Sequence, residues 1–182
     1  MRVIAGRYKG MTVPMPKKGT IRPTTDRSKE ALFSIINSRY DLEELEVLDL
    51  FGGSGGVALE FSSRSAKNVV SVEKNRRVHQ QFKEFVKTKG VEDLTPVCSD
   101  VFGFLKHTND QFDLIFADPP YDLKRIKDIP DIVLNHSVLR PDGLLIIEHH
   151  ATFQWNHQSL LESRKYGQSV FSFFQFDVPL EV

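Results

Sequence analysis

The chain has almost no cysteine and no long apolar run. Cys98 is the single cysteine among 182 residues, which excludes an intrachain disulfide and any metal site built from several cysteines. Cys98 falls in a β-prone run, so we expect it to be a buried structural thiol. No apolar stretch approaches the roughly 20 residues of a membrane span, and the first residues lack the apolar core of a signal peptide. We therefore expect a cytoplasmic protein without membrane contact.

In other respects the composition is ordinary. Hydrophobic residues make up 40% and charged residues 26% of the chain, close to the average for globular proteins. The length fits one domain with a small appendage. We expect an N-terminal extension of a basic hairpin and a helix over residues 1–40, followed by a larger domain over residues 41–182. A monomer is the default expectation.

Charge is distributed unevenly along the chain. Residues 1–29 hold eight basic side chains and one acid, Asp26, whereas the remaining residues hold 16 basic and 23 acidic side chains. A basic segment attached to an acidic body favours a localised contact with a polyanion. The alternative is a solvated hairpin that carries its charges without a partner.

The middle of the chain alternates strand-like and helix-like segments. This alternation predicts a mostly parallel sheet covered by helices on both faces. The predicted strands are 47–51, 69–73, 94–98, 112–117 and 143–148, and the predicted helices are 57–61, 75–87, 101–106 and 126–135.

The two ends of the chain break the alternation. Short β-prone runs at 3–5 and 11–13 predict a hairpin, and Thr24 and Thr25 are candidate N-caps of a following helix. Near the C-terminus we expect a helix over 153–161. After it, the runs at 163–166 and 169–176 flank Gly167-Gln168 and predict an antiparallel hairpin that closes the sheet.

The sequence Asp118-Pro119-Pro120-Tyr121 ends the fourth strand-like run. Neither proline can donate to a sheet ladder, so the strand must stop there. The turn then offers a carboxylate, unpaired carbonyls and an aromatic ring. Such a group suits a planar substrate that bears an amino group.

A glycine-rich loop and two acids accompany this turn. The loop Gly52-Gly53-Ser54-Gly55-Gly56 follows the first parallel strand, Glu73 ends the second and Asp100 ends the third. The carboxyl ends of parallel strands are where open α/β sheets bind ligands, and an acid about twenty residues after such a loop can accept ribose hydroxyls. Together these features predict a nucleotide-like cofactor, and Asp49 at the loop entrance favours one with a cationic amino group.

These residues resemble a known family. The segments Asp49-Leu50-Phe51-Gly52-Gly53-Ser54-Gly55, Val72-Glu73, Asp100 and Asp118-Pro119-Pro120-Tyr121 are similar to those of amino-methyltransferases that use S-adenosylmethionine. Segments 2–10 and 22–33 narrow the resemblance to the bacterial RsmD family, which methylates the exocyclic N2 of a guanine in small-subunit (16S) ribosomal RNA. The family usually has alanine at the position of Gly52 and glycine at that of Ser65.

The resemblance implies a Rossmann-like class I methyltransferase fold, a seven-stranded sheet with a C-terminal antiparallel hairpin, and S-adenosylmethionine as cofactor. Glu73 would bind the ribose hydroxyls, Asp100 the adenine amino group, and the backbone N–H of Val101 the adenine ring. The implied cofactor contacts are Asp49, Phe51, Gly52, Gly53, Gly55, Glu73, Lys74, Asp100, Val101, Thr24 and Thr25.

The resemblance also implies the substrate contacts. Asp118 and the Pro119 carbonyl would accept from the target amine, Tyr121 would stack on the base, and no metal would be needed. The implied RNA contacts are Arg7, Lys9, Arg22, Arg27 and Pro120. The partner would be ribosomal RNA within a small-subunit assembly particle.

Three alternatives share some of these features. The same amine-binding turn would serve a methyltransferase acting on adenine N6 or on a protein glutamine. The glycine-rich loop would also suit a nicotinamide-dependent oxidoreductase, although its spacing departs from Gly-x-Gly-x-x-Gly. A catalytically silent RNA-binding module would keep the basic segment alone.

Overall fold

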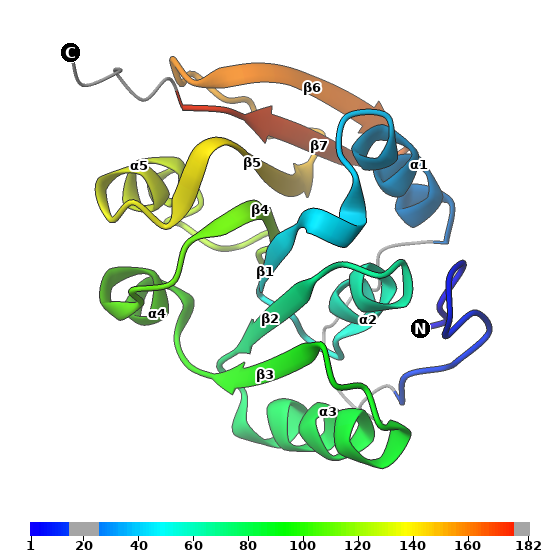
Figure 1. Cartoon of the computed structure of the whole chain (residues 1–182). Helices are drawn as coiled ribbons and strands as arrows, with labels where there is room; N and C mark the ends of the chain where they lie inside the picture. The colour runs from blue at the N-terminus through cyan, green and yellow to red at the C-terminus, as the bar shows by residue number, and fades with distance from the viewer. Residues whose placement is uncertain (15–25, 177–182) are drawn as a thin grey trace.

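The computed structural model describes residues 1–14 and 26–176. Its centre is a seven-stranded sheet with the order β3-β2-β1-β4-β5-β7-β6 (Figure 1). The first five strands are parallel, and β7 pairs antiparallel with both β5 and β6. The strands are β1 Glu46–Leu50, β2 Asn68–Glu73, β3 Leu94–Cys98, β4 Phe112–Ala117, β5 Leu139–His150, β6 Leu160–Tyr166 and β7 Ser169–Phe174. This confirms the predicted seven-stranded, mostly parallel sheet and its closing antiparallel hairpin.

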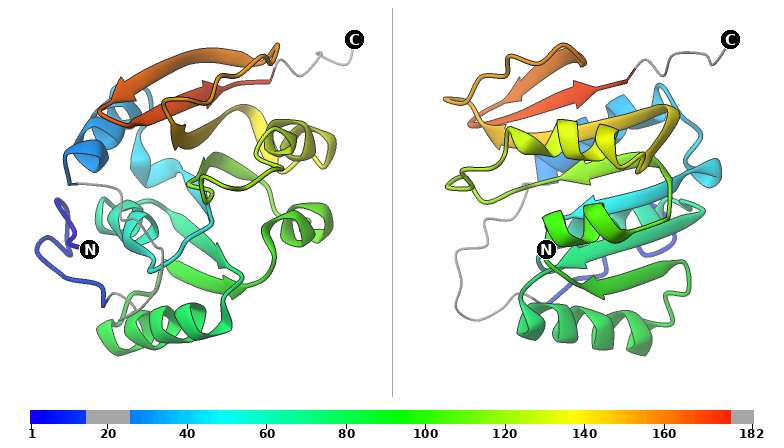
Figure 2. Two further views of the ribbon diagram at one scale, coloured as in Figure 1. Left: turned by 180° about the vertical axis from the view of Figure 1, so that it is seen from behind. Right: turned by 90° about the vertical axis from the view of Figure 1, so that its left-hand side faces the viewer.

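Helices cover both faces of the sheet (Figure 2). One core contains apolar residues of α1, α2 and α3, and the other contains those of α4 and α5. The helices are α1 Asp26–Asn37, α2 Gly56–Ser63, α3 Arg76–Lys89, α4 Val101–His107 and α5 Asp128–Asn135, with a short 3₁₀ helix, η1, at Leu42–Glu44. Within the described residues, no helix is both long and apolar enough to cross a membrane.

Residues 1–14, which we call the arm, form the predicted hairpin as a short pairing outside the main sheet. Arg2 bridges Thr12, and the N–H of Val3 donates to the Met11 carbonyl at 2.9 Å. Val3 and Val13 are buried in the same core as α1 and α2. The predicted N-caps Thr24 and Thr25 lie outside the described residues.

Two local predictions are wrong. Residues 151–159 form no helix, and β6 begins at Leu160. In this segment Phe153, Trp155 and His157 alternate with exposed residues, a period of two that belongs to extended chain. Cys98 is exposed rather than buried, because it is the last residue of β3 and β3 is an edge strand.

Ser65 is one of the positions at which this chain differs from the family that it resembles. It follows α2 and has a φ of 68°, in the left-handed region that costs a residue with a Cβ roughly 1 kcal/mol. The glycine that the family usually carries suits this backbone conformation better.

Candidate active site

The sheet order reverses between β1 and β4, which lie side by side although β2 and β3 intervene in the sequence. The chain leaves β1 toward β2 on one side and leaves β4 toward β5 on the other. The loops at the carboxyl ends therefore diverge, and open α/β sheets bind their ligands at such a reversal. The glycine-rich loop follows β1 and Asp118 follows β4, so the predicted cofactor and amine elements meet at this point.

The glycine-rich loop turns sharply into α2. Phe51 has a φ of 63°, an uncommon conformation for an aromatic residue that concentrates at functional sites. Gly55, the residue before α2, has a φ of 82°, and a Cβ there would lie 2.0 Å from the Phe82 ring. Only glycine therefore lets α3 pack so closely on the loop. The N-terminus of α2 lies at the carboxyl edge of the sheet, where the helix dipole can attract an anionic or polar ligand group.

Glu73 links the loop to the end of β2. Its Oε2 accepts a hydrogen bond from the N–H of Gly53 at 3.0 Å, and its Oε1 accepts one from the N–H of Asn75 at 2.6 Å. Lys74, beside it, is exposed. Glu73 thus connects the end of β2 to the backbone of the glycine-rich loop.

Asp49 lies beneath the loop and is only 2% exposed. Its Oδ2 accepts a hydrogen bond from the Ser71 hydroxyl at 3.3 Å. Burial raises the pKa of Asp49 to about 7, against opposing hydrogen bonds from Ser71 and the Ala58 backbone, and the nearby charge of Glu73 adds to the rise. A cationic partner would stabilise the ionised form of a carboxyl group that is buried in this way.

Asp100 caps the next helix. It is exposed, and its Oδ1 accepts from the N–H of Gly103 at 3.0 Å. Val101, the first residue of α4, is buried. The carboxylate therefore has a structural role at the N-terminus of α4, and its position at the carboxyl edge also fits the predicted contact with a cofactor.

The Asp118–Tyr121 turn follows β4, on the other side of the reversal from the glycine-rich loop. Asp118 is partly buried and Pro119 is buried, whereas Pro120 and Tyr121 are exposed. The N–H of Leu123 donates to the Pro120 carbonyl at 2.9 Å and closes the turn. The Tyr121 ring meets the His150 ring edge-on at a centroid distance of 5.3 Å. Tyr121 thus presents an exposed aromatic surface beside the turn.

Sequence reasoning did not assign Glu148, which the register brings close to this turn. Ala117 pairs with Ile147, so Asp118 and Glu148 each lie one residue beyond that pair on adjacent strands. Glu148 is 3% exposed. The signal that could have found it is the one that identified Glu73 and Asp118, an acid at the end of an apolar parallel strand.

The arm is fastened to the body by a buried carboxylate. Glu60 of α2 is fully buried and accepts from the N–H groups of Ile4 at 2.7 Å and Ala5 at 3.1 Å. Its carboxylate also pairs with Arg64 at 2.8 Å and lies 3.8 Å from the buried ammonium of Lys29. Burial lowers the pKa of Lys29, although the charge of Glu60 opposes that effect.

The described cations of residues 1–29 are mostly engaged. Arg2 pairs with Asp26 at 3.1 Å, and Arg7 pairs with Asp93 and donates to the Ser62 carbonyl. Lys29, which the charge count included, faces the core and not solvent. Lys9 is exposed. Of the other predicted RNA contacts, Arg22 lies outside the described residues, and so does the side chain of Arg27.

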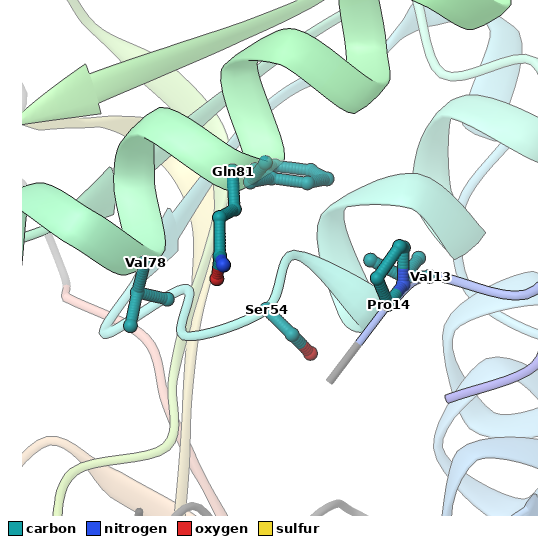
Figure 3. Close-up of a pocket in the computed structure, with 6 residues that line it drawn as sticks. Val13, Pro14, Ser54, Val78 and Gln81 are labelled. Carbon is teal, nitrogen blue, oxygen red and sulfur yellow. The ribbon is translucent and has the colours of Figure 1, made fainter. Parts of the chain in front are cut away.

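A small pocket joins the arm, the loop and α3. Figure 3 shows Ser54 of the loop between Val13 and Pro14 of the arm and Val78 and Gln81 of α3. The Ser54 hydroxyl is buried and has no hydrogen-bond partner within the described structure. The end of the arm therefore lies directly against the glycine-rich loop.

A metal site needs several ligating side chains close together. Residues 1–14 and 26–176 contain no group of three or more histidine, cysteine, aspartate or glutamate side chains able to hold an ion.

Comparison with known proteins agrees with this geometry. Residues 1–175 match the family model described as conserved hypothetical protein 95. The chain is 32% identical to ribosomal RNA small subunit methyltransferase D of Haemophilus influenzae over 152 residues, which cover 81% of this chain and 78% of that protein.

Solved structures show the same fold. A hypothetical protein of Thermus thermophilus matches with a TM-score of 0.85 and 27% identity, over 97% of this chain and 99% of that one. The 16S rRNA N2 G1207 methyltransferase of Thermus thermophilus, in complex with S-adenosylmethionine and guanosine, matches with a TM-score of 0.66 and 20% identity, over 87% and 44%. The fold is that of the S-adenosylmethionine-dependent methyltransferases, and the chain belongs to the small-subunit ribosomal RNA methyltransferase D family.

Proposed function

We propose that this protein transfers a methyl group from S-adenosylmethionine to the exocyclic N2 amine of a guanine in small-subunit ribosomal RNA. The observation that carries the proposal is the Asp118-Pro119 turn beside the glycine-rich loop at the reversal of the sheet. Membership of the ribosomal RNA methyltransferase D family supports RNA as the substrate. We further infer that the protein acts as a cytoplasmic monomer on an assembling small subunit.

The carboxylates near the carboxyl ends of β1, β2 and β3 fit the polar groups of S-adenosylmethionine. Glu73 offers a carboxylate for ribose hydroxyls next to the Gly53 backbone. Asp49 offers a buried carboxyl for a cationic amino group, and its raised pKa of about 7 reflects a desolvation cost that such a partner would offset. Asp100 and Val101 at the start of α4 complete the adenine end. When bound, the cofactor supplies the methyl group as an electrophile.

The Asp118 carboxylate and the Pro119 carbonyl prepare the attacking nitrogen. The lone pair of an aryl amine is delocalised into its base, so the amine is a weak nucleophile. Two acceptors that take both amine hydrogens direct the lone pair toward the methyl group and favour a pyramidal nitrogen. The carboxylate also stabilises the positive charge that develops on the nitrogen. Alignment within about 3–3.5 Å of the methyl carbon supplies much of the rate.

Tyr121 supports entry of the base. The residue is 48% exposed, and its ring lies at the end of the turn, beside the His150 ring. An exposed aromatic ring at this place suits stacking of a base that has left its helix. Adenine N6 and a protein glutamine offer the same amine chemistry, and the family relationship is what favours guanine in RNA over them.

The test is Asp118→Asn, with Asp122→Asn as the matched control, because Asp122 is an exposed acid in the same loop. We expect Asp118→Asn to lower methyl transfer to unmodified 16S rRNA by at least about a hundredfold, as for the loss of a group that stabilises transition-state charge. S-Adenosylmethionine binding, measured by isothermal titration calorimetry on the same samples, should stay within about twofold. Asp122→Asn should retain both. Full transfer by Asp118→Asn would refute the role of the turn.

A further inference from the structure

The helix α3 carries an uncompensated row of cations. Glu84 is the one acid within α3, whereas six basic side chains along the helix and just before it are exposed: Lys74, Arg76, Arg77, Lys83, Lys87 and Lys89. Within the part of the chain that the structure describes, none of the six forms an ion pair with an acid. This contrasts with Arg2, Arg7 and Lys29, whose charges each meet a carboxylate.

Three of these cations form one stripe. Arg76, Lys83 and Lys87 are separated by seven and four residues, so they share one side of the helix. Val78 and Phe82 are buried on the other side. At 1.5 Å per residue the stripe extends for about 16 Å, which is enough to follow several consecutive phosphates of one strand.

The position of α3 connects the stripe to both the site and the arm. The helix begins directly after Glu73 and Asn75 at the carboxyl edge of the sheet, and it forms the outer side of the molecule next to β3 (Figure 1). Val13 and Pro14 of the arm meet Val78 and Gln81 of α3 around one pocket. The arm therefore packs on the Val78 side of α3 and leaves the stripe uncovered, and Arg76 at the start of the stripe lies near the carboxyl edge of the sheet.

The charge pattern favours a bound polyanion over simple solvation. Lys83 and Lys87 lie four residues apart on one helix face, a like-charge arrangement that weakens an isolated helix. A face of this kind gains from phosphates, which replace the missing acidic partners.

We infer that the exposed face of α3 binds the phosphate backbone of the substrate RNA, and that its cations, more than the engaged arginines of the arm, supply the electrostatic part of RNA affinity. The inference rests on the proposed function for the identity of the polyanion. It assigns α3 a positioning role that leaves the chemistry at Asp118 unchanged.

The experiment compares K83E/K87E with K106E/K165E in the full chain. Both variants change the net charge equally, both replace exposed lysines, and neither touches the cofactor loop or the turn. Binding of an unmodified 16S rRNA transcript is measured without cofactor at several salt concentrations, and methyl transfer is measured separately against RNA concentration. K83Q/K87Q repeats the test without introducing negative charge.

We expect K83E/K87E to weaken RNA binding by about tenfold or more and to reduce the slope of log affinity against log salt by about 1.4, which is two single-strand phosphate contacts. KM for RNA should rise while kcat and S-adenosylmethionine binding remain unchanged, and K106E/K165E should behave as wild type. RNA affinity and salt slope equal to wild type in both α3 variants, or equal losses in the K106E/K165E control, would overturn the inference. Binding is measured without turnover, so the two proposals fail in different ways. Unchanged RNA binding in the α3 variants would refute the role of α3, whereas absence of methyl transfer in the wild type would refute the proposed function.

Discussion

The carboxylates of the site are held very differently. Glu73 ends β2 and Asp100 follows β3, as their spacing after apolar runs predicts, whereas Asp49 lies within β1, one residue before its end. Asp49 is buried under the loop, Glu73 is partly buried and accepts two backbone N–H groups, and Asp100 is exposed and caps α4. These differences arise from the packing of α2 and α4, which strand-end spacing does not encode.

The raised pKa of Asp49 predicts a pH dependence of cofactor binding. A cationic amino group favours ionised Asp49, so binding below the pKa of about 7 must release a proton. We expect S-adenosylmethionine affinity to increase as pH rises from 5 to 7, by at most about tenfold per pH unit, and then to level off. Calorimetry in buffers of different ionisation enthalpy measures both the affinity and the released proton.

The cofactor-free protein provides a control for this assignment. The folded pKa of Asp49 lies above its ordinary value of 3.8, so the folded state binds the extra proton between these values. The free energy of unfolding should therefore fall as pH rises from about 4 to 7 and change little above that range. Asp49→Asn should remove this contribution and flatten the binding profile. An unchanged binding profile in Asp49→Asn would show that another group titrates.

At the scale of the elements, periodicity predicted the sheet, its closing hairpin and the helices that cover it. The predicted helix over 153–161 is wrong because Trp155 packs in an aromatic cluster with Phe153, His149 and Phe174 along an extended segment. The polar residues between the aromatics gave a period of two, which was the available signal. The anchoring of the arm was not predictable, because Glu60 is distant in sequence from the Ile4 and Ala5 amides that it binds.

The contacts between Glu60 and the arm predict how much stability is lost when the Glu60 carboxylate is removed. Glu60→Ala leaves two arm N–H groups without their acceptor and leaves the buried ammonium of Lys29 with Asp26, at 3.7 Å, as its remaining carboxylate. Breaking a buried charge pair from one side costs about 3–5 kcal/mol, so we expect a loss of that order in urea unfolding. Trypsin should also cleave after Arg7 or Lys9 faster under native conditions.

The matched control is Glu84→Ala, which removes an exposed glutamate from α3. Its effect on unfolding should stay within about 0.5 kcal/mol, as for most surface substitutions. If Glu60→Ala and Glu84→Ala give the same stability and the same cleavage rate, the anchoring role of Glu60 is wrong.

At the scale of the whole molecule, the charge count over residues 1–29 predicts a polyanionic partner, but it does not show which cations are available to meet one. Counting treats every cation of residues 1–29 as available, whereas Arg7 pairs with Asp93 and Lys29 is buried against Glu60. Only the folded chain brings those partners together. The net charge of the whole chain is zero, so it gives no sign of the cations of α3. These cations are exposed in the structure.

The most direct test of the proposed activity is the identity of the methylated nucleoside. The protein is incubated with labelled S-adenosylmethionine and with 16S rRNA or small subunits from cells that lack this protein, and the RNA is digested to nucleosides. We predict one labelled product, N2-methylguanosine, which Asp118→Asn fails to form. Label on adenine N6, or no label on either RNA or subunits, would contradict this prediction.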